Sequence, residues 1–324
     1  MRILVIGGAG YIGAHMSKCL AEAGHDVVVL DDFSTGHRAA VRWGRLEQAS
    51  IADTAALDRI LGGQRYDGVM HFAALSLVGE SMLDPLRYYR NNVANVMTLL
   101  EAMRRHGVDR FIFSSTAAVF GEPQADLIDE LHPLQPINPY GASKLMVERL
   151  LSDCAAAYGL RSVALRYFNA AGADASGLIG ESHNPETHLI PKLLRRAAGE
   201  DSAVRIFGDD YPTPDGTCIR DYIHVADLSQ AHLLALQYLN GHAGAHVFNL
   251  GNGTGYSVRE VVSAVERVIG RSLNVETASR RPGDPARLVA SSERARRELG
   301  WQPRIAELEQ IVESAWRWHQ KPAY

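Results

Sequence analysis

The sequence has few cysteines and no long hydrophobic run. Its three cysteines, Cys19, Cys154 and Cys218, are far apart in 324 residues and lack metal-site spacing. Separated cysteines in odd number give no disulfide framework and favour a reducing compartment. No apolar stretch approaches the roughly 18 residues of a membrane span, and the four apolar residues 3–6 are too few for a signal peptide. We therefore expect a cytoplasmic protein, with no membrane contact and no metal.

An excess of positive charge is also missing. The formal net charge is −4 and no basic block occurs, which argues against a nucleic-acid partner. The fractions of hydrophobic residues (46%) and charged residues (22%) are ordinary for a globular protein. Because 324 residues exceed the roughly 250–300 at which a single core stops growing, we expect two lobes.

The N-terminal segment carries the first strong pattern. The apolar run 3–6 is typical of a strand buried on both faces. A glycine turn, a helical pattern, a second predicted strand at 26–30 and Asp31 follow it. Strand, glycine turn, helix, strand and acid in this order are typical of a dinucleotide-binding unit. Strands and helices continue to alternate, so we predict an α/β fold with a doubly wound parallel (Rossmann) sheet.

The glycine turn and the acid have a physical reason. Gly7, Gly10 and Gly13 let the backbone turn close to a pyrophosphate, whose charge the helix N-terminus stabilises. Asp31 follows Gly13 by 18 residues, where a carboxylate can bind both adenosine-ribose hydroxyls. A carboxylate would repel a 2′-phosphate, so NAD is favoured over NADP. A glycine turn that serves only packing is the alternative, and Asp32 is as readily a solvated turn residue as a ligand.

Tyr140 and Lys144 are four residues apart just before a predicted helix over residues 145–158. Positions i and i+4 share a helix face, so both side chains can point at one volume. A free tyrosine has a pKa of about 10, and a nearby cation lowers that value. The pair could therefore act as a proton acceptor. A half-buried Tyr and a solvated Lys on an ordinary surface helix are the alternative.

Polar side chains end the strand predicted at 110–113. Ser114, Ser115 and Thr116 stand at its carboxyl end, where parallel sheets bind ligands. Their hydroxyls could bond a substrate and the phenol of Tyr140, although a serine/threonine turn with local backbone bonds explains them too.

A change of composition after residue 170 suggests the boundary between the lobes. Residues 170–187 are rich in Gly, Ala, Ser, Asn and Pro. We expect an NAD-binding domain over 1–170 and a smaller α/β substrate-binding domain over 171–324, with some segments returning to the first. In the second, Arg220 and Arg281 are candidates for clamping a diphosphate. Each alone also reads as a surface ion-pair residue.

Together these features resemble the extended short-chain dehydrogenase/reductase family over essentially the whole chain. The features are Gly7-x-x-Gly10-x-x-Gly13, Asp31, the Thr116 turn and Tyr140-x-x-x-Lys144. Longer stretches at 71–75, 78–81, 88–92, 138–141, 166–172, 207–213 and 215–225 narrow the resemblance to the UDP-sugar 4-epimerases of that family. The resemblance implies interconversion of UDP-galactose and UDP-glucose through a transient 4-keto sugar, with tightly bound NAD. It also implies a homodimer, formed through the helix after Pro85 and the helix of Tyr140.

The resemblance implies roles for individual residues. Tyr140 would be the acid/base at the sugar O4, Lys144 would bond the nicotinamide ribose and lower the tyrosine pKa, and Thr116 would position O4. The implied cofactor-binding residues are Gly7, Gly10, Tyr11, Ile12, Gly13, Asp31, Asp32, Ser50, Ile51, Phe72, Ala73, Ala74, Asn91, Ser114, Tyr140, Lys144 and Tyr167. The implied substrate-binding residues are Thr116, Tyr140, Asn169, His188, Leu189, Arg205, Phe207, Arg220, Arg281 and Asp284.

Several positions depart from the family pattern. Ser50 stands where an acid is common, Ser76 where some members have lysine, and His188 where asparagine is common. These differences put local cofactor and uridine contacts in question. Leu288 stands where a bulky tyrosine can exclude N-acetyl sugars. We therefore expect that UDP-N-acetylhexosamines are also accepted.

Other functions are open to a chain of this kind, among them that of another NAD-dependent nucleotide-sugar epimerase. A nucleotide-sugar 4,6-dehydratase needs an acid/base pair just after the threonine of this turn, where the chain has Ala117 and Ala118. A non-catalytic NAD-sensing protein of the same fold can dispense with the Tyr/Lys pair. The presence of that pair argues for an enzyme.

Overall fold

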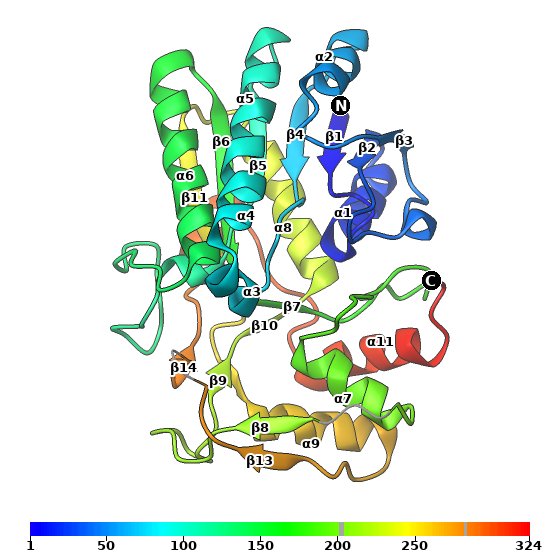
Figure 1. Ribbon diagram of the computed structural model, residues 1–324, viewed down its shortest axis with the longest axis vertical. Coiled ribbons are helices and arrows are strands. Elements are labelled where there is room, and N and C mark those ends of the chain that lie inside the picture. Colours follow the sequence, from blue (N-terminus) through cyan, green and yellow to red (C-terminus); the bar gives the residue numbers. More distant parts are fainter. Residues whose placement is uncertain (201–203, 282–283) are drawn as a thin grey trace.

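The computed structural model describes residues 1–200, 204–281 and 284–324. Pro282 and Gly283, which stand between the predicted substrate-binding residues Arg281 and Asp284, lie outside these residues. The upper part of the molecule in Figure 1 is a parallel sheet between helices, and shorter strands and three further helices form the lower part.

The sheet has seven parallel strands in the order β11-β6-β5-β4-β1-β2-β3. These strands are β1 Arg2–Ile6, β2 Asp26–Asp31, β3 Arg45–Gln48, β4 Gly68–His71, β5 Arg110–Ser114, β6 Arg161–Tyr167 and β11 Ala245–Leu250. The strand order reverses between β1 and β4. Ligands bind outside the carboxyl ends of strands at such a switch point. The predicted α/β fold class is therefore confirmed.

Both faces of the sheet are buried, which explains the apolar runs in the sequence. Ile3 and Val5 of β1 pack on one face, and Leu4 and Ile6 pack on the other. The first face is covered by α1 Tyr11–Glu22, α8 Val225–Tyr238 and α10 Glu293–Leu299. The second is covered by α2 Thr54–Gly63, α5 Asn95–Arg105 and α6 Pro139–Tyr158.

The helix expected after Pro85 is interrupted. It divides into α4 Pro85–Tyr89, a π-helical segment η2 Arg90–Ala94 and α5, and α3 Val78–Leu83 precedes it. π-Helical turns appear frequently at functional sites. Here the turn contains Asn92, a buried side chain with bonds to two other segments. The spacing of apolar residues in the sequence could not indicate these bonds, because they join segments that are distant in the sequence.

The lower part has its own core. Helices α7 Leu189–Ala197, α9 Val258–Ile269 and α11 Leu308–Gln320 pack together beneath β7 Asn169–Ala171 and β10 Tyr222–His224 (Figure 1). Two further small sheets lie there. One contains β12 Tyr256–Ser257, β9 Ile219–Arg220 and β14 Arg287–Leu288, and the other contains β13 Glu276–Ala278 and β8 Arg205–Phe207. Although β11 and α8 follow residue 170, they pack in the upper part.

Across the described residues, none of the helices has the length and apolar character needed to cross a membrane. Cys19, Cys154 and Cys218 are free thiols.

Candidate active site

The glycine turn lies between β1 and α1, beside the switch point of the sheet. Gly7 has φ +76°, and a Cβ there would lie 2.6 Å from the Ala73 backbone nitrogen. A Cβ on Gly13 would lie 2.1 Å from the Gly7 carbonyl oxygen. Helix α1 starts after Gly10, and no side chain in the described chain caps it. The turn therefore offers uncovered backbone and a positive helix end, which fits a dinucleotide pyrophosphate.

Asp31 ends β2 beside this turn. Its Oδ2 accepts a hydrogen bond from the Ala9 N–H at 2.9 Å, and its Oδ1 accepts one from the Phe33 N–H at 2.8 Å. Burial raises the pKa of the Asp31 carboxyl, while these two bonds oppose the rise. The carboxylate is thus fixed in place where we expect the ribose. Asp32 is exposed and accepts from the Ser34 N–H at 2.9 Å, which is the geometry of a solvated turn residue.

The other residues predicted to contact the cofactor line the same edge of the sheet. Phe72, Ala73 and Ala74 follow β4, and the Phe72 N–H donates to the Ile6 carbonyl at 2.8 Å. Ile12 lies in the first turn of α1 and is partly buried. Ser50 receives a bond from the Ala52 N–H at 3.3 Å, and Ile51 is buried.

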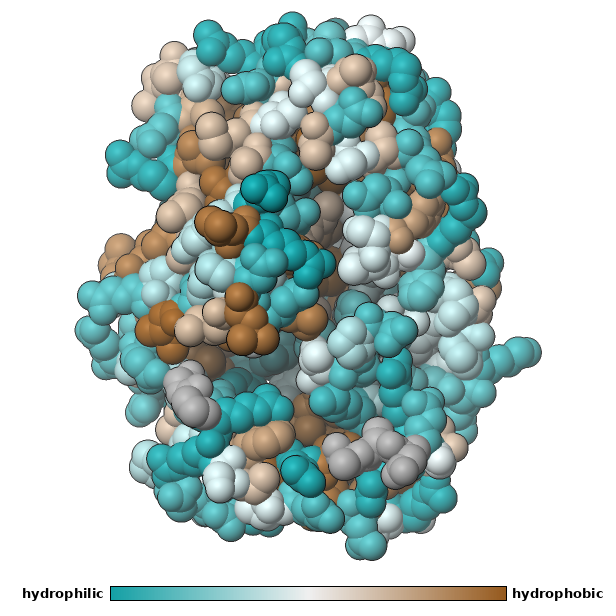
Figure 2. All heavy atoms as spheres, viewed as in Figure 1, coloured by the Kyte–Doolittle hydropathy of each residue, from teal (hydrophilic) through white to brown (hydrophobic). Residues whose placement is uncertain are grey.

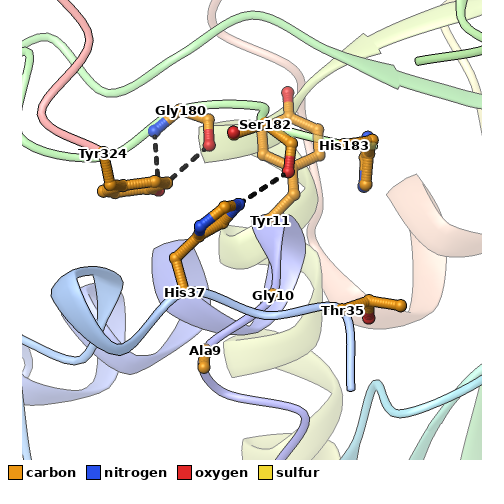
Figure 3. A pocket seen from close by; sticks show the side chains of 9 residues that line it. All are labelled: Ala9, Gly10, Tyr11, Thr35, His37, Gly180, Ser182, His183 and Tyr324. Carbon is orange, nitrogen blue, oxygen red and sulfur yellow. Dashed lines mark hydrogen bonds between the residues drawn. The ribbon is translucent and has the colours of Figure 1, made fainter. Parts of the chain in front are cut away.

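A small cavity of about 30 Å³ adjoins the glycine turn. Ala9, Gly10 and Tyr11 line it on one side, and Gly180, Ser182, His183 and Tyr324 line it on the other. Figure 3 shows the His37 ring donating to the Ser182 carbonyl and Tyr324 bonded to Gly180 across this space. The glycine turn is therefore covered by the segment that follows β7.

Helix α6 holds Tyr140 and Lys144 at its first turns. The Asn138 side chain accepts from the Gly141 N–H at 2.8 Å, and Pro139 occupies the first helical position. Both features favour a helix start at this point. Tyr140 is half-buried, whereas Lys144 is 3% exposed. Lys144 Nζ donates to the Ser114 carbonyl at 2.8 Å and lies 6.0 Å from the centre of the Tyr140 ring.

Burial acts on both pKa values. It raises the pKa of the Tyr140 phenol, and the hydrogen bond with Thr116 lowers it in part. It lowers the pKa of Lys144 to about 7, against the charge of Glu148, which raises it. Near neutral pH Lys144 is therefore divided between its charged and neutral forms. The sequence predicted that a nearby cation lowers the pKa of the Tyr140 phenol. In the protein chain alone, desolvation of the phenol opposes that shift.

The polar end of β5 faces this pair. Thr116 is buried, its hydroxyl accepts from the Ala118 N–H at 3.1 Å, and it begins the short 3-10 turn η3 Ala117–Val119. The Ser114 hydroxyl bonds the Tyr167 phenol, whose pKa is raised by burial. The structure thus brings Thr116, Tyr140, Lys144, Ser114 and Tyr167 together, as the sequence predicted for residues at one edge of the sheet.

A buried ion pair behind Lys144 was not foreseen. Glu148 lies one turn further along α6, and both its oxygens accept from the Arg166 guanidinium, at 3.0 Å and 2.5 Å. The Ser115 hydroxyl donates to Glu148 at 2.5 Å. All three side chains are buried. The i, i+8 spacing from Tyr140 was visible in the sequence, but the pairing with Arg166 of β6 was not.

Asn92 is a second residue that the sequence did not single out. Its side chain bonds both the N–H and the carbonyl of Leu75, each at 2.9 Å, and the Ser143 hydroxyl at 3.1 Å. Ser143 in turn donates to the Tyr140 carbonyl at 2.7 Å. Asn92 therefore ties the segment after β4 to the start of α6. Asn91, the residue predicted to contact the cofactor, donates to Asn92 at 2.9 Å.

The predicted substrate-binding residues lie mostly in the lower part. Arg220 on β9 pairs with Asp284, and the Arg281 guanidinium stacks over the Phe207 ring at 3.9 Å. Asn169 Nδ2 donates to the Asp221 carbonyl at 2.9 Å. Arg205 is exposed and lies 3.5 Å from Glu276, so it is placed at the surface.

His188 and Leu189 occupy the entry to α7. Leu189 is the first residue of the helix. The His188 ring contacts two acidic side chains, because its Nδ1 lies 2.8 Å from Glu181 and 3.0 Å from Glu186. The side chain predicted to contact uridine is therefore engaged by two carboxylates. The sequence spacing Glu-x-His-x-x-Glu-x-His over 181–188 is the signal that would have found this group.

Comparison with known proteins shows the family of the chain. The model of the NAD dependent epimerase/dehydratase family matches residues 3–251, and the chain belongs to this family. It is 50% identical over 321 residues to the UDP-glucose 4-epimerase of Lacticaseibacillus casei, covering 99% of this chain and 97% of that protein. A solved UDP-glucose 4-epimerase of Brucella ovis in complex with NAD is 48% identical, covers 97% of both chains and has a TM-score of 0.95. The UDP-Glc/GlcNAc 4-epimerase of Campylobacter jejuni is 43% identical, covers 99% of both chains and has a TM-score of 0.87.

Proposed function

We propose that this protein is an NAD-dependent UDP-sugar 4-epimerase that interconverts UDP-galactose and UDP-glucose. One observation carries the proposal: the half-buried Tyr140 phenol is hydrogen-bonded to Thr116 and stands beside the fixed Lys144. This group lies at the carboxyl ends of the strands, on the same edge as the glycine turn. The whole-length similarity to UDP-glucose 4-epimerases supports the same function.

The residues of the chain divide the chemistry among them. NAD, when bound, accepts the hydride of sugar C4 and returns it. Tyr140 takes the O4 proton as the sugar is oxidised and gives it back as the sugar is reduced, so no net redox change remains. Thr116 orients the O4 hydroxyl and the phenol. A positive charge close to the phenol lowers its pKa, and protonated Lys144 supplies one.

The two parts of a UDP-sugar need different treatment. Both faces of the sugar must be presented to the cofactor, so the sugar has to turn while the nucleotide is held. Arg220 and Arg281 are the groups proposed to hold the diphosphate, because guanidinium groups bind phosphate in bidentate fashion. Asn169, Leu189, Phe207 and Asp284 are proposed to complete the nucleotide site.

A nucleotide-sugar 4,6-dehydratase is disfavoured by the turn after Thr116. Ala117 and Ala118 occupy the positions where an acid/base pair would expel water. The site can thus move a proton and a hydride at one carbon. A protein that only senses NAD would not require the pair of Tyr140 and Lys144.

The proposal is tested by incubating purified protein with UDP-galactose without added NAD. We expect UDP-glucose to form until the two sugars reach equilibrium, because the cofactor is regenerated in every turnover. Product analysis by anion-exchange chromatography separates the two sugars. An absence of UDP-glucose even when NAD is supplied would overturn the proposal.

We further propose that UDP-N-acetylhexosamines are substrates. Leu288 lies on β14 opposite Arg220 and packs against the hydrophobic cluster that contains Ala117, the residue after Thr116. A Leu288→Tyr variant should lose turnover of UDP-N-acetylgalactosamine by about 10-fold or more, with a smaller effect on UDP-galactose, since pocket shape discriminates by roughly 1–3 kcal/mol. Wild-type protein without activity toward UDP-N-acetylgalactosamine would contradict this expectation.

A homodimer and a cytoplasmic location complete the proposal. Exposed apolar side chains gather on α3 and α4, including Met82, Leu83 and Leu86, and Figure 2 shows hydrophobic residues on this face. Met97 on α5 and Met146 on α6 are also exposed. Such a patch suits burial against a second copy. Light scattering of the purified protein would distinguish dimer from monomer.

A further inference from the structure

Two glutamates and two histidines, one of them the predicted substrate-binding residue His188, meet in one segment of the chain. Glu181, His183, Glu186 and His188 lie in the segment between β7 and α7, and one potential ligand atom from each lies within 4.8 Å of the other three. The sequence predicted no metal, because its three cysteines lack metal-site spacing. Imidazole nitrogens and carboxylate oxygens are ligands of divalent transition metals.

The distances suit a common centre. His183 Nδ1 lies 3.3 Å from Glu181 Oε1 and 3.6 Å from Glu186 Oε2. His188 Nδ1 lies 2.8 Å from Glu181 Oε1 and 3.0 Å from Glu186 Oε1. Metal–ligand distances of about 2.0–2.2 Å in a tetrahedron correspond to ligand–ligand distances of about 3.3–3.6 Å. Small movements would bring all four atoms to a zinc ion.

The orientation of the polar atoms gives a second, independent observation. Within the described part of the chain, Glu181 Oε1, His183 Nδ1 and Glu186 Oε2 are buried and have no hydrogen-bond partner. Yet Glu181 Oε1 lies only 2.8 Å from His188 Nδ1. An ion placed between these atoms would accept the lone pairs that they leave without hydrogen-bond partners.

One glutamate is already oriented by the backbone. Glu186 Oε1 accepts from the Thr187 N–H at 2.7 Å and from the His188 N–H at 2.8 Å. Its other oxygen, Oε2, is left to face His183. Outer hydrogen bonds of this kind fix the ligands of metal sites.

The charges of these side chains also favour a bound cation. Glu181 is 6% exposed and Glu186 is 8% exposed. Two carboxylates buried together require compensation. A divalent cation with two neutral imidazoles supplies two positive charges at once. A metal-free network of protonated histidines is the competing arrangement: in it His188 Nδ1 bonds Glu186 Oε1 at 3.0 Å, while the three buried atoms have no hydrogen bond in the described part of the chain.

We propose that Glu181, His183, Glu186 and His188 bind one structural zinc ion. The ion would fasten the segment that covers the glycine turn. Tyr11 of that turn donates its phenol O–H to the Gly172 carbonyl at 2.6 Å and packs edge-on to the His183 ring. The Trp318 indole of α11 donates to the Glu181 carbonyl at 2.9 Å. In Figure 3, His183 and Tyr11 lie beside the cavity that Gly10 and His37 also line.

Zinc content of tag-free protein tests the site. We expect about one zinc per chain by elemental mass spectrometry after extensive desalting, as for a four-ligand structural site. His183→Gln and Glu186→Gln should each lower the content at least about 5-fold, since loss of a ligand weakens binding. His246→Gln is the matched control, because this histidine bonds the Ala243 carbonyl near the surface and should leave the content unchanged.

If a variant does not fold, measurements on the wild-type protein still test the proposal. Removal of the ion with a chelator should lower the midpoint of thermal unfolding by several degrees, and one equivalent of ZnCl2, but not MgCl2, should restore it. Wild-type protein with less than about 0.1 zinc per chain, and no saturable binding of added ZnCl2, would overturn the proposal. Variants that keep the wild-type zinc content would overturn the assignment to these residues.

Discussion

Two groups of residues differ in how they are held. The first, the proposed catalytic corner, comprises Tyr140, Lys144, Glu148 and Arg166, and the second, the arginine side of the lower lobe, comprises Arg220 and Arg281. Lys144, Glu148 and Arg166 are buried and held by several hydrogen bonds. Arg220 is partly buried and pairs with Asp284, its one acidic partner among the described residues, and Arg281 is exposed over the Phe207 ring. The first group has its geometry before any ligand arrives. The second can exchange its contacts for a phosphate, which suits a nucleotide that must enter and leave.

The largest expected effect concerns the phenol of the catalytic corner. Tyr140→Phe should lower kcat about 10³-fold or more, because general acid–base catalysis contributes roughly 10²–10⁴-fold. Binding of NAD should persist, as measured by the nucleotide released on denaturation. Tyr158→Phe, at the exposed end of the same helix, is the control and should keep its activity. Equal activity of both variants would remove Tyr140 from its role.

The buried ion pair can be compared with an exposed one on the same helix. Glu148→Gln should lower the free energy of unfolding by about 3–5 kcal/mol, because the Arg166 charge is left buried without its partner. Asp153→Asn breaks the exposed pair of Arg149 and Asp153, and should cost less than about 1 kcal/mol. Urea unfolding of both variants measures the difference, and similar losses would refute the contrast.

The lowered pKa of Lys144 predicts a pH dependence of stability. The folded chain releases this proton near pH 7, whereas the unfolded chain holds it up to about pH 10.4. The free energy of unfolding should therefore rise with pH between about 7 and 10, relative to Lys144→Met, by up to about 1.4 kcal/mol per pH unit. Below pH 7 the full cost of the buried charge is present. Parallel curves for the two proteins would contradict a shifted lysine.

The smallest effect is expected on the arginine side. Arg220→Ala should raise KM for UDP-galactose about 10- to 100-fold with little change in kcat, since a hydrogen bond to a charged group contributes about 1.5–3 kcal/mol. Arg267→Ala removes an exposed ion pair with Glu309 in the same lobe and is the control. A loss confined to kcat would place Arg220 in the chemistry instead.

The sequence predicted the features that depend on local order. The dinucleotide unit was visible because the apolar run of β1, the glycine turn and Asp31 follow one another directly. The helix face that Tyr140 and Lys144 share was visible for the same reason. Helix α9 was not singled out, although Ser257 and Glu260 form a capping box at its start.

Contacts between distant segments could not be predicted. Glu148 of α6 bonds Arg166 of β6, and the Asn92 side chain bonds both Leu75 and Ser143. Burial also altered the chemistry expected of the Tyr/Lys pair. Spacing predicted that a cation would lower the phenol pKa, but desolvation raises it and lowers the pKa of the lysine. Such shifts depend on packing that periodicity does not encode.

The fate of the hydrogen at C4 tests the central claim most directly. UDP-galactose carrying deuterium at C4 should give UDP-glucose that retains the deuterium at C4, in protein without added NAD. Proton NMR and mass spectrometry of the product measure this retention. Loss of deuterium to solvent, or a 4-keto-6-deoxy product, would contradict reversible hydride transfer at one carbon.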